Sequence, residues 1–415
     1  MHQKLLYLPI FLITVLSCSK KQITLPPDNP NSNLINTVSL TDTAMKQMAG
    51  IYTLSQGSGA LGGQFVCKGS KYKLSFFSEL NGIFIILDYG LNPSDSSIQF
   101  SGFWRYSESS TQGTISMSIS KAEGSVEFLR TGDPANLTVQ GNFKDQNGTA
   151  QTMTLKFGRP FSQYAIQHEF QIYAHHGVQT TVNPPYAENS ILGVMHDEDY
   201  GVNGLEFDIQ LTKDHVPICM HDDDINIRLT EKGPLSGNYS QYNFAFLEQY
   251  IKLVDGQPIA SLEHALQVFI DSTTLKNFWM DIKGDPDIFK YLEPIVRNAY
   301  AHAADKKRDV VIIADMPSKE VIDEFHAWPA YADLPTMCEQ SLQDVIDTKS
   351  EYYGPRFTEG LILDQVEQAH GMGIKVISWT LNDKNLILNY LQNGKFDGFI
   401  SDYPAYVVYY FYTLF

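Results

Sequence analysis

At 415 residues the chain is long enough for two or three domains of ~150 residues each, and its composition, 43% hydrophobic and 19% charged, is that of a folded globular protein. The formal net charge of -17 argues against nucleic acid as a partner, because such binding depends on Lys and Arg side chains that neutralise phosphates. A small anionic substrate stays compatible with an acidic chain if a metal ion and a few donors reverse the field inside one cleft.

The N-terminus has the pattern of an export signal. Lys4 precedes an apolar run at positions 5–16, which fits the hydrophobic region of a signal peptide and is too short to span a bilayer. Ser17-Cys18 then resembles the end of a bacterial lipobox. We expect residues 1–17 to be a signal peptide and Cys18 to carry the lipid that anchors the protein in the bacterial cell envelope, facing the periplasm or the exterior. The alternative is an ordinary signal peptide with an incidental cysteine.

Residues 18–40 are predicted to form the lipidated N-terminus and a flexible tether, because this stretch is polar, contains three prolines and cannot bury a core. The remaining cysteines, Cys67, Cys219 and Cys338, are odd in number and lack the spacing of metal ligands. We expect them to be small buried apolar residues rather than parts of a disulfide framework.

Between positions 41 and 160 apolar and polar residues alternate, as at Ile115, Met117 and Ile119. A period of two is typical of antiparallel strands with one apolar face. Asn147-Gly148 separates two such runs and favours a hairpin, because both central residues of a tight type I′ turn need positive φ. The pattern predicts an N-terminal all-β domain over residues 41–160, either a sandwich or a small barrel, whose ligand the sequence does not identify.

After position 160 short strand-like runs alternate with helix-like stretches. Alternation of this kind predicts parallel strands joined by helical crossovers, and the ~250 residues that remain match the usual size of a (β/α)8 barrel. We therefore predict an α/β fold with a (β/α)8 TIM barrel over residues 165–415. In that fold catalytic groups lie at the C-terminal ends of the strands. The strand-like runs fall at positions 170–174, 204–210, 278–282, 310–314, 375–379 and 398–400.

Charged residues occur in pairs on two of these strands. Glu206 and Asp208 stand two positions apart, so both side chains would project into the barrel. Two buried carboxylates repel each other unless a cation holds them, and oxygen ligands suit Mg2+ or Ca2+. If the strand lay at an edge, both acids could simply be solvated. Asp281 and Lys283 repeat the spacing with opposite charges, which fits either a metal ligand with a phosphate-binding cation or an internal salt bridge.

Histidines end two other strand-like runs. His175-His176-Gly177 closes the first, and His221 closes a run that starts at Val216. Imidazoles at a barrel mouth can exchange protons near neutral pH. The alternative for the first pair is a surface histidine pair at a turn.

These segments and the order in which they follow one another resemble the glycerophosphodiester phosphodiesterase family, part of the superfamily of phosphatidylinositol-phospholipase-C-like phosphodiesterases. The resemblance spans nearly all of residues 170–405. It rests on His175-His176-Gly177, Glu188-Asn189-Ser190, Gly204-x-Glu206-x-Asp208, Leu211-Thr212-Lys213-Asp214, His221-Asp222, Arg228-x-Thr230, Gly256-x-Pro258-Ile259-x-x-Leu262, Asp281-x-Lys283, Trp379-Thr380-x-Asn382 and Asp397-Gly398-x-x-Ser401-Asp402-x-Pro404.

The resemblance implies a role for each matching position. His175 and His221 match the paired general acid and base, one of which activates the attacking hydroxyl or water while the other protonates the leaving alcohol. Three acids match the ligands of one divalent metal, Ca2+ or Mg2+, which neutralises the phosphate and orients the glycerol hydroxyl. These metal ligands are Glu206, Asp208 and Asp281, and the matching substrate-binding positions are His176, Glu188, Lys283 and Trp379.

Two positions depart from the family pattern. His176 stands where the family usually has an arginine, and an imidazole cannot reproduce the bidentate grip of a guanidinium on phosphate. Asp281 stands where glutamate is common, and its side chain is one methylene shorter, so the metal would shift toward that strand or a water would bridge the gap.

The sequence thus predicts a lipid-anchored, metal-dependent phosphodiesterase that hydrolyses small glycerophosphodiesters to glycerol phosphate and an alcohol. One alternative is a related barrel that acts on phospholipids or lysophospholipids. Another is a non-catalytic binding module for glycerol phosphate ligands, which the missing arginine favours and the retained histidines and acids oppose.

Overall fold

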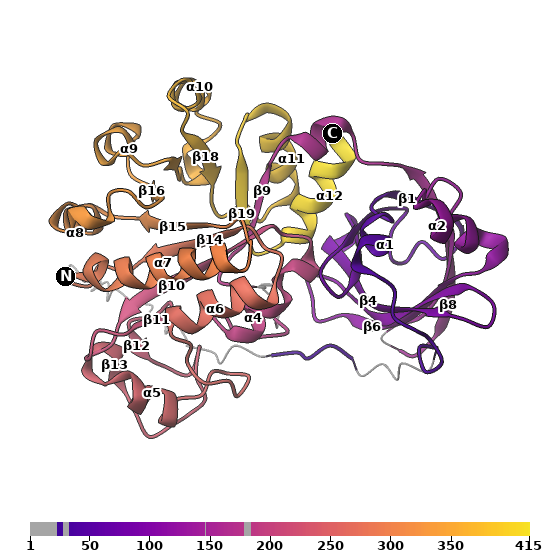
Figure 1. The fold of residues 1–415 in the computed structure, drawn as a ribbon, viewed down its shortest axis with the longest axis horizontal. Coiled ribbons are helices and arrows are strands. Elements are labelled where there is room, and N and C mark those ends of the chain that lie inside the picture. The colour runs from indigo at the N-terminus through magenta and orange to yellow at the C-terminus, as the bar shows by residue number, and fades with distance from the viewer. Residues whose placement is uncertain (1–22, 28–32, 146, 178–183) are drawn as a thin grey trace, which may run out of the picture.

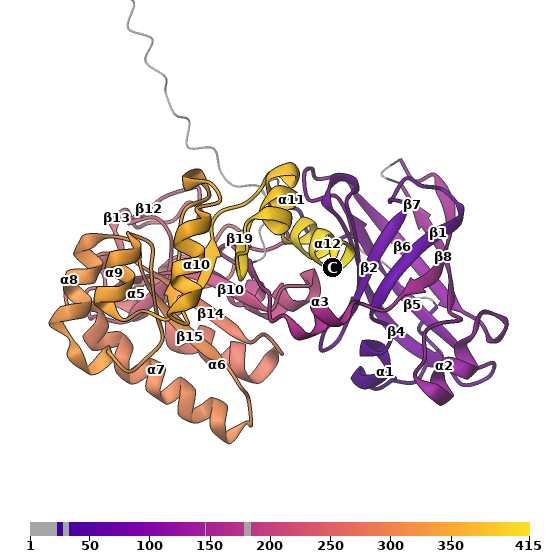
Figure 2. The same cartoon turned by 90° about the horizontal axis from the view of Figure 1, so that it is seen from above.

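The structure, a computed structural model, describes residues 23–27, 33–145, 147–177 and 184–415. These residues form two closed barrels that lie side by side, the first coloured indigo to magenta and the second magenta to yellow (Figures 1 and 2). Cys18, the predicted lipidation residue, lies outside the described residues. Within them, no helix has both the length and the apolar character that crossing a membrane requires.

The first barrel consists of antiparallel strands, each paired with the next along the chain until β8 closes on β1. The predicted all-β domain is therefore a small barrel rather than a sandwich. Apolar side chains, among them Phe65, Phe100 and Met117, fill its interior. Its elements are β1 (Gly50–Gly57), β2 (Gln64–Gly69), β3 (Leu74–Ser78), β4 (Ile83–Asn92), β5 (Ser97–Arg105), β6 (Gln112–Ile119), β7 (Thr138–Lys144), β8 (Ala150–Arg159), α1 (Asp42–Lys46) and α2 (Ser125–Thr131).

Burial alternates along a strand only where one face of this barrel meets solvent. In β6, buried and half-buried residues alternate from end to end. In β4 the first five residues are all buried, because Phe84 and Ile86 point outward and pack against the second barrel. A strand buried on both faces has no two-residue period, which explains why the alternation in the sequence weakens there.

Strands β7 and β8 form the hairpin that Asn147-Gly148 predicted, but their connection is longer than a two-residue turn. The last pair of the ladder is Lys144 with Ala150, so the loop occupies positions 145–149. Asp145 stabilises it by accepting hydrogen bonds at Oδ1 from the backbone N–H groups of Asn147 and Thr149, both at 2.9 Å.

The described residues of the predicted tether contact the folded chain. The backbone of Val38 pairs with Leu91, and the Arg105 guanidinium donates a 2.9 Å hydrogen bond to the carbonyl of Thr24. These contacts place residues 23–27 against the first barrel.

The second barrel is a ring of parallel strands with helices outside it, as the sequence predicted. It closes where β19 pairs with β9, and β11 adds an antiparallel strand beside β10. Tyr173, Trp279 and Ile313 belong to the apolar layer that fills its interior. The strands are β9 (Gln171–Ala174), β10 (Gly204–Leu211), β11 (Pro217–Cys219), β14 (Asn277–Ile282), β15 (Val311–Met316), β16 (Thr336–Cys338), β17 (Tyr352–Tyr353), β18 (Lys375–Ser378) and β19 (Gly398–Ser401).

Helices cover this ring, and most begin at a residue whose side chain accepts a backbone N–H of the first turn, such as Ser261, Ser318 and Asp383. A small lobe with its own apolar core follows β11 and contains β12 (Asp224–Ile225), β13 (Gly237–Asn238) and α5 (Phe244–Tyr250). The other helices are α3 (Gln163–Gln167), α4 (Ile191–His196), α6 (Leu262–Ser272), α7 (Ile288–Asp305), α8 (Lys319–Ala327), α9 (Leu342–Thr348), α10 (Leu363–Gly371), α11 (Lys384–Asn393) and α12 (Pro404–Leu414).

The C-terminal helix α12 joins the two barrels. It lies between them in both views and contacts β2 and β3 of the first barrel as well as β9 and β19 of the second (Figures 1 and 2). Its residues from Pro404 to Phe411 are all buried, which explains why the end of the chain is apolar on every side. Arg159 at the end of β8 donates hydrogen bonds to the carbonyls of Tyr412 and Thr413. The three cysteines after position 18 are buried and unpaired, as expected.

Candidate active site

Three carboxylates meet at the C-terminal ends of two neighbouring strands of the second barrel. Glu206 and Asp208 both point inward from β10, and Asp281 stands opposite Asp208 on β14. One ligand atom from each acid lies within 4.8 Å of the other two. The acids that the sequence suggested as metal ligands therefore converge.

Burial makes this arrangement costly unless a cation is present. Glu206 is 2% exposed and Asp208 is 0% exposed. Burial, together with the charge of Asp208, raises the pKa of Glu206 well above its usual value, and burial also raises the pKa of Asp281. Burial acts on the pKa of Asp208 in the same direction, but interactions with His176 and Lys283 outweigh it, so that this pKa is lowered.

Lys283 supplies part of the positive charge that the acids require. Its Nζ atom lies 2.7 Å from Asp208 Oδ1 and 2.9 Å from Asp281 Oδ2. Among the described residues, Glu206 Oε1 and Asp281 Oδ1 are buried and have no hydrogen-bond partner. Buried acceptors without a donor are rare in proteins, and clustered carboxylate oxygens are the ligands of hard divalent cations. The donor set therefore fits the metal that the sequence predicted.

His175 stands at the end of β9 beside these acids. Its Nδ1 lies 2.6 Å from Asp402 Oδ1, and its Nε2 lies 4.0 Å from Glu206 Oε2. Asn382 donates a 2.7 Å hydrogen bond to the other oxygen of Asp402 and so fixes that carboxylate. A carboxylate on Nδ1 holds the proton there and leaves Nε2 to exchange a proton with a substrate. The hydrogen bond from His175 lowers the pKa of Asp402 although burial opposes this.

His221 has the same arrangement on the neighbouring side of the mouth. Its Nδ1 lies 2.7 Å from Asp222 Oδ1, and the Arg228 guanidinium donates to both oxygens of that carboxylate. Arg228 also forms a 3.1 Å ion pair with Glu188 Oε1. Glu188 therefore positions Arg228, and Arg228 in turn positions Asp222 and His221.

His176 lies between the other two imidazoles. Its ring centroid is 3.7 Å from that of His175 and 5.0 Å from that of His221. Burial lowers the pKa of His176 to about 3, so the ring is neutral at physiological pH. The backbone at this residue is left-handed, with φ of 54°, a conformation that histidine adopts more readily than bulky or branched residues.

A hollow of about 400 Å³ opens above the carboxylates. Of the predicted substrate-binding residues, His176 and Trp379 are among the described residues that line it, whereas Glu188 and Lys283 lie behind, paired with Arg228 and with the acids. His175 and His221 also line the hollow, together with Glu206, Trp279, Asp281, Pro317, Glu339, Arg356, Thr380 and Ile400.

Part of the second barrel matches a known protein family. Residues 175–280, which carry His175, His176, His221, Glu206 and Asp208, match the model of the glycerophosphoryl diester phosphodiesterase family. Over these residues the second barrel is similar to this family.

The chain is also similar to individual proteins of known sequence or structure. A glycerophosphodiester phosphodiesterase from Bacillus altitudinis is 24% identical over 251 residues, which cover 56% of this chain and 95% of the relative. Among solved structures, a phosphodiesterase from Oleispira antarctica in complex with the product sn-glycerol-3-phosphate is 20% identical, covers 59% of this chain and 97% of its own, and has a TM-score of 0.45. A glycerophosphodiester phosphodiesterase from Parabacteroides distasonis is 19% identical, covers 56% and 93%, and has a TM-score of 0.46.

The structure shows roles for several residues of the second barrel to which the sequence assigned none. Asp402, Asn382 and Asp222 stood within the family motifs, but only the structure shows that they hold the histidines. Arg356 and Glu339 stood in no motif. The Arg356 guanidinium lies 5.2 Å from the centroid of the Trp379 ring, a cation–π distance.

A further buried acid lies next to the candidate metal ligands in the second barrel. Asp315 on β15 stands opposite Asp281, and burial raises its pKa to about 7. Its Oδ2 accepts a 3.0 Å hydrogen bond from Nε1 of Trp279, the indole that forms the floor of the site. Glu339 on the next strand connection has a pKa well above its usual value, because of burial and the charge of Asp315.

Proposed function

We propose that this enzyme is a metal-dependent phosphodiesterase that hydrolyses glycerophosphodiesters to glycerol phosphate and an alcohol. The observation that carries the proposal is the matched pair of imidazoles, His175 and His221, each held by a carboxylate at Nδ1 beside one cluster of buried acids. The match to the family model supports the reaction class, hydrolysis of a phosphoric diester.

The acids would hold the cation of this site. Glu206, Asp208 and Asp281 offer carboxylate oxygens from two adjacent strands, a set that by itself suits Mg2+ or Ca2+. When bound, a divalent cation supplies Lewis-acid stabilisation of the charge on the nonbridging phosphate oxygens.

The histidines would move the protons. In the first step one imidazole accepts the proton of the glycerol hydroxyl as its oxygen bonds to phosphorus, and the other donates a proton to the alcohol oxygen as its bond to phosphorus breaks. In the second step water opens the resulting cyclic phosphate with the two roles exchanged, and glycerol phosphate is released. The protons balance over the two steps, because each imidazole ring ends the cycle in the protonation state in which it began.

Turnover of soluble diesters tests the proposal. Protein lacking residues 1–17 is expected to release the alcohol from glycerophosphocholine, glycerophosphoethanolamine or glycerophosphoinositol with Mg2+, Ca2+ or Mn2+, and to lose this activity in EDTA. His175→Ala and His221→Ala should each lower kcat by at least about 10²-fold. A folded protein that cleaves none of these diesters with any of the metals would contradict the proposal.

We also propose that the enzyme acts in the bacterial cell envelope, anchored through Cys18. The support is the sequence alone, namely the apolar run at positions 5–16 and the lipobox-like Ser17-Cys18. Full-length protein expressed in a diderm bacterium should fractionate with membranes and incorporate labelled palmitate, and Cys18→Ala should lose both properties. Labelling that persists in Cys18→Ala would contradict the anchor.

A further inference from the structure

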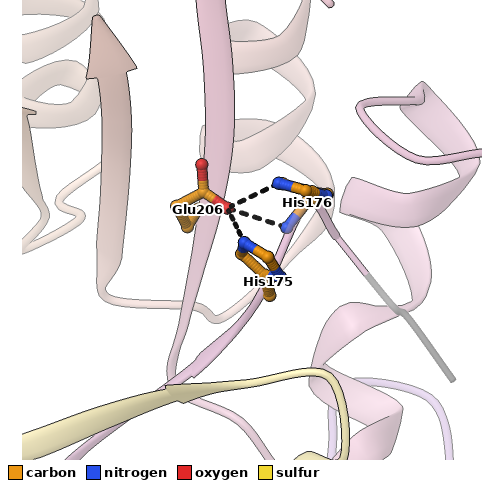
Figure 3. Close-up of side chains that lie close together, drawn as sticks. All are labelled: His175, His176 and Glu206. Atoms are coloured by element: carbon orange, nitrogen blue, oxygen red, sulfur yellow. Dashed lines mark hydrogen bonds and ion pairs between the residues drawn. The ribbon is translucent and has the colours of Figure 1, made fainter. Parts of the chain in front are cut away.

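The His176 side chain faces the acids as well as the hollow. Its Nε2 lies 3.5 Å from Asp208 Oδ2 and 4.0 Å from Glu206 Oε2, and its backbone N–H donates a 2.8 Å hydrogen bond to the same Glu206 oxygen. Figure 3 shows dashed lines from one oxygen of Glu206 to the backbone nitrogen and the ring Nε2 of His176, and a third line to His175. The ring therefore presents a nitrogen to two of the acids that would hold the cation.

The distances from His176 Nε2 to the two carboxylates are similar to those between two ligand atoms that bind the same ion. Two donors that each lie ~2.1 Å from a shared cation stand about 3–4 Å apart over the usual range of ligand angles. His176, Glu206, Asp208 and His221 all fall in groups whose ligand atoms lie within 4.8 Å of one another, and His176 belongs to two of these groups. Glu206 is 2% exposed, and its other oxygen, Oε1, has no hydrogen-bond partner among the described residues.

We propose that His176 Nε2 is a ligand of the divalent cation, alongside Glu206, Asp208 and Asp281, and that the site consequently prefers Mn2+, Co2+ or Zn2+ to Mg2+ or Ca2+. Imidazole nitrogen suits borderline transition metals, whereas carboxylate oxygen alone suits hard cations. The inference rests on the metal site of the proposed function and adds a ligand and a metal preference to it.

The two departures from the family pattern fit together on this basis. Asp281 is one methylene shorter than the usual glutamate, and His176 replaces an arginine whose charge would repel a cation. An imidazole nitrogen from the end of β9 then adds a donor to a ligand set in which the acid on β14 is shorter. The phosphate grip of the arginine is lost at this position.

His175 is the weaker candidate for this ligand. Its Nε2 approaches only Glu206, at 4.0 Å, and its Nδ1 is held by Asp402 as expected for a proton-transfer group. The experiment must therefore separate the two neighbouring rings.

Metal binding, measured without substrate, tests the proposal. Protein lacking residues 1–17 is stripped with a chelator and titrated calorimetrically with Co2+, Mn2+ and Mg2+, and the Co2+ form is examined by visible absorption and by electron spin-echo spectroscopy for coupling to imidazole nitrogen. We expect nitrogen coupling in the wild type and in His175→Ala, and none in His176→Ala or His176→Gln. The His176 variants should bind Co2+ at least about tenfold more weakly, with Mg2+ affinity changed less than about threefold.

His302→Ala is the matched control, because this histidine lies on the surface and pairs with Asp271 through Nε2 at 2.9 Å. It should leave the stoichiometry and the nitrogen coupling unchanged. Circular dichroism checks that each variant is folded. Nitrogen coupling that persists in folded His176→Ala, or is lost in His175→Ala instead, overturns the assignment even if diesters are cleaved. A protein that binds Mg2+ and cleaves diesters but shows no preference for Co2+ or Mn2+ also overturns it and leaves the proposed function standing.

Discussion

The Nδ1 atom of His175 lies 2.6 Å from the Oδ1 atom of Asp402, although the two residues stand 227 positions apart in the chain. The contact forms because β19 pairs with β9 and closes the barrel, so that the loops after these two strands meet at the same end. The residue that follows the last strand of the second barrel thus orients a proton-transfer group that follows its first strand.

Asp402→Asn should therefore impair catalysis without unfolding the protein. An amide can donate to Nδ1 and stabilise the wrong tautomer, so we expect kcat to fall by about 10²–10⁴-fold with little change in KM. Steady-state kinetics on a soluble diester measure this. Asn382→Ala removes the 2.7 Å hydrogen bond to Asp402 but leaves the carboxylate, and its loss should stay below about tenfold. Equal losses in the two variants would argue against control of the tautomer.

Arg228→Met should destabilise the protein in a manner that depends on pH. Burial raises the pKa of Asp222, but hydrogen bonds from Arg228 and His221 outweigh it and hold this pKa below the ordinary 3.8. A lowered carboxyl pKa contributes stability that is complete above the unfolded value and is lost as pH falls through the folded value. The Tm difference between wild type and variant should be largest near pH 7 and shrink from about pH 4 downward. Thermal scans from pH 7 to pH 2 would show a constant difference if the ion pair were irrelevant.

Lys283→Met should make folding depend more strongly on a divalent cation. The ammonium contacts Asp208 and Asp281, and its removal leaves buried like charges without compensation. We expect the metal-free variant to lose about 2–4 kcal/mol of unfolding free energy. Added Mn2+ should raise its Tm by more than it raises that of the wild type, because the cation then neutralises the same oxygens. A variant as stable as the wild type in EDTA would contradict this.

The C-terminal helix should be essential for the stability of the pair of barrels. Phe411 is 1% exposed and stacks on Phe170 with ring centroids 4.6 Å apart. Phe411→Ala should lower the free energy of unfolding by about 3–5 kcal/mol in chemical denaturation. Leu414, which is 38% exposed on the same helix, gives the control, and its replacement by alanine should cost less than about 1 kcal/mol. Similar costs for the two would show that α12 is not part of the core.

Much of this architecture could be predicted from the sequence, because the signals involved are local. The period-two pattern at Ile115, Met117 and Ile119 reports one buried face, and the spacing of Glu206 and Asp208 places both acids on one side of a strand. The order of motifs then fixed which segments meet at the barrel mouth.

What could not be predicted depends on contacts between distant segments. Neither the pairing of Glu188 with Arg228 nor the position of Arg356 over Trp379 has a local signature. The direction of His176 follows from a left-handed backbone at that residue, which spacing alone does not reveal. Alternation also failed in β4, because the second barrel buries its outer face.

The central claim is that Glu206, Asp208 and Asp281 hold a cation between two proton-transfer histidines, and phosphorus NMR of one diester tests it most directly. With metal-loaded wild type, the phosphorus resonance of glycerophosphoinositol should be replaced by that of glycerol phosphate. Folded Asp208→Asn should neither bind Mn2+ tightly nor convert the diester. Conversion by Asp208→Asn at the wild-type rate, or by wild-type protein in excess EDTA, would contradict the account.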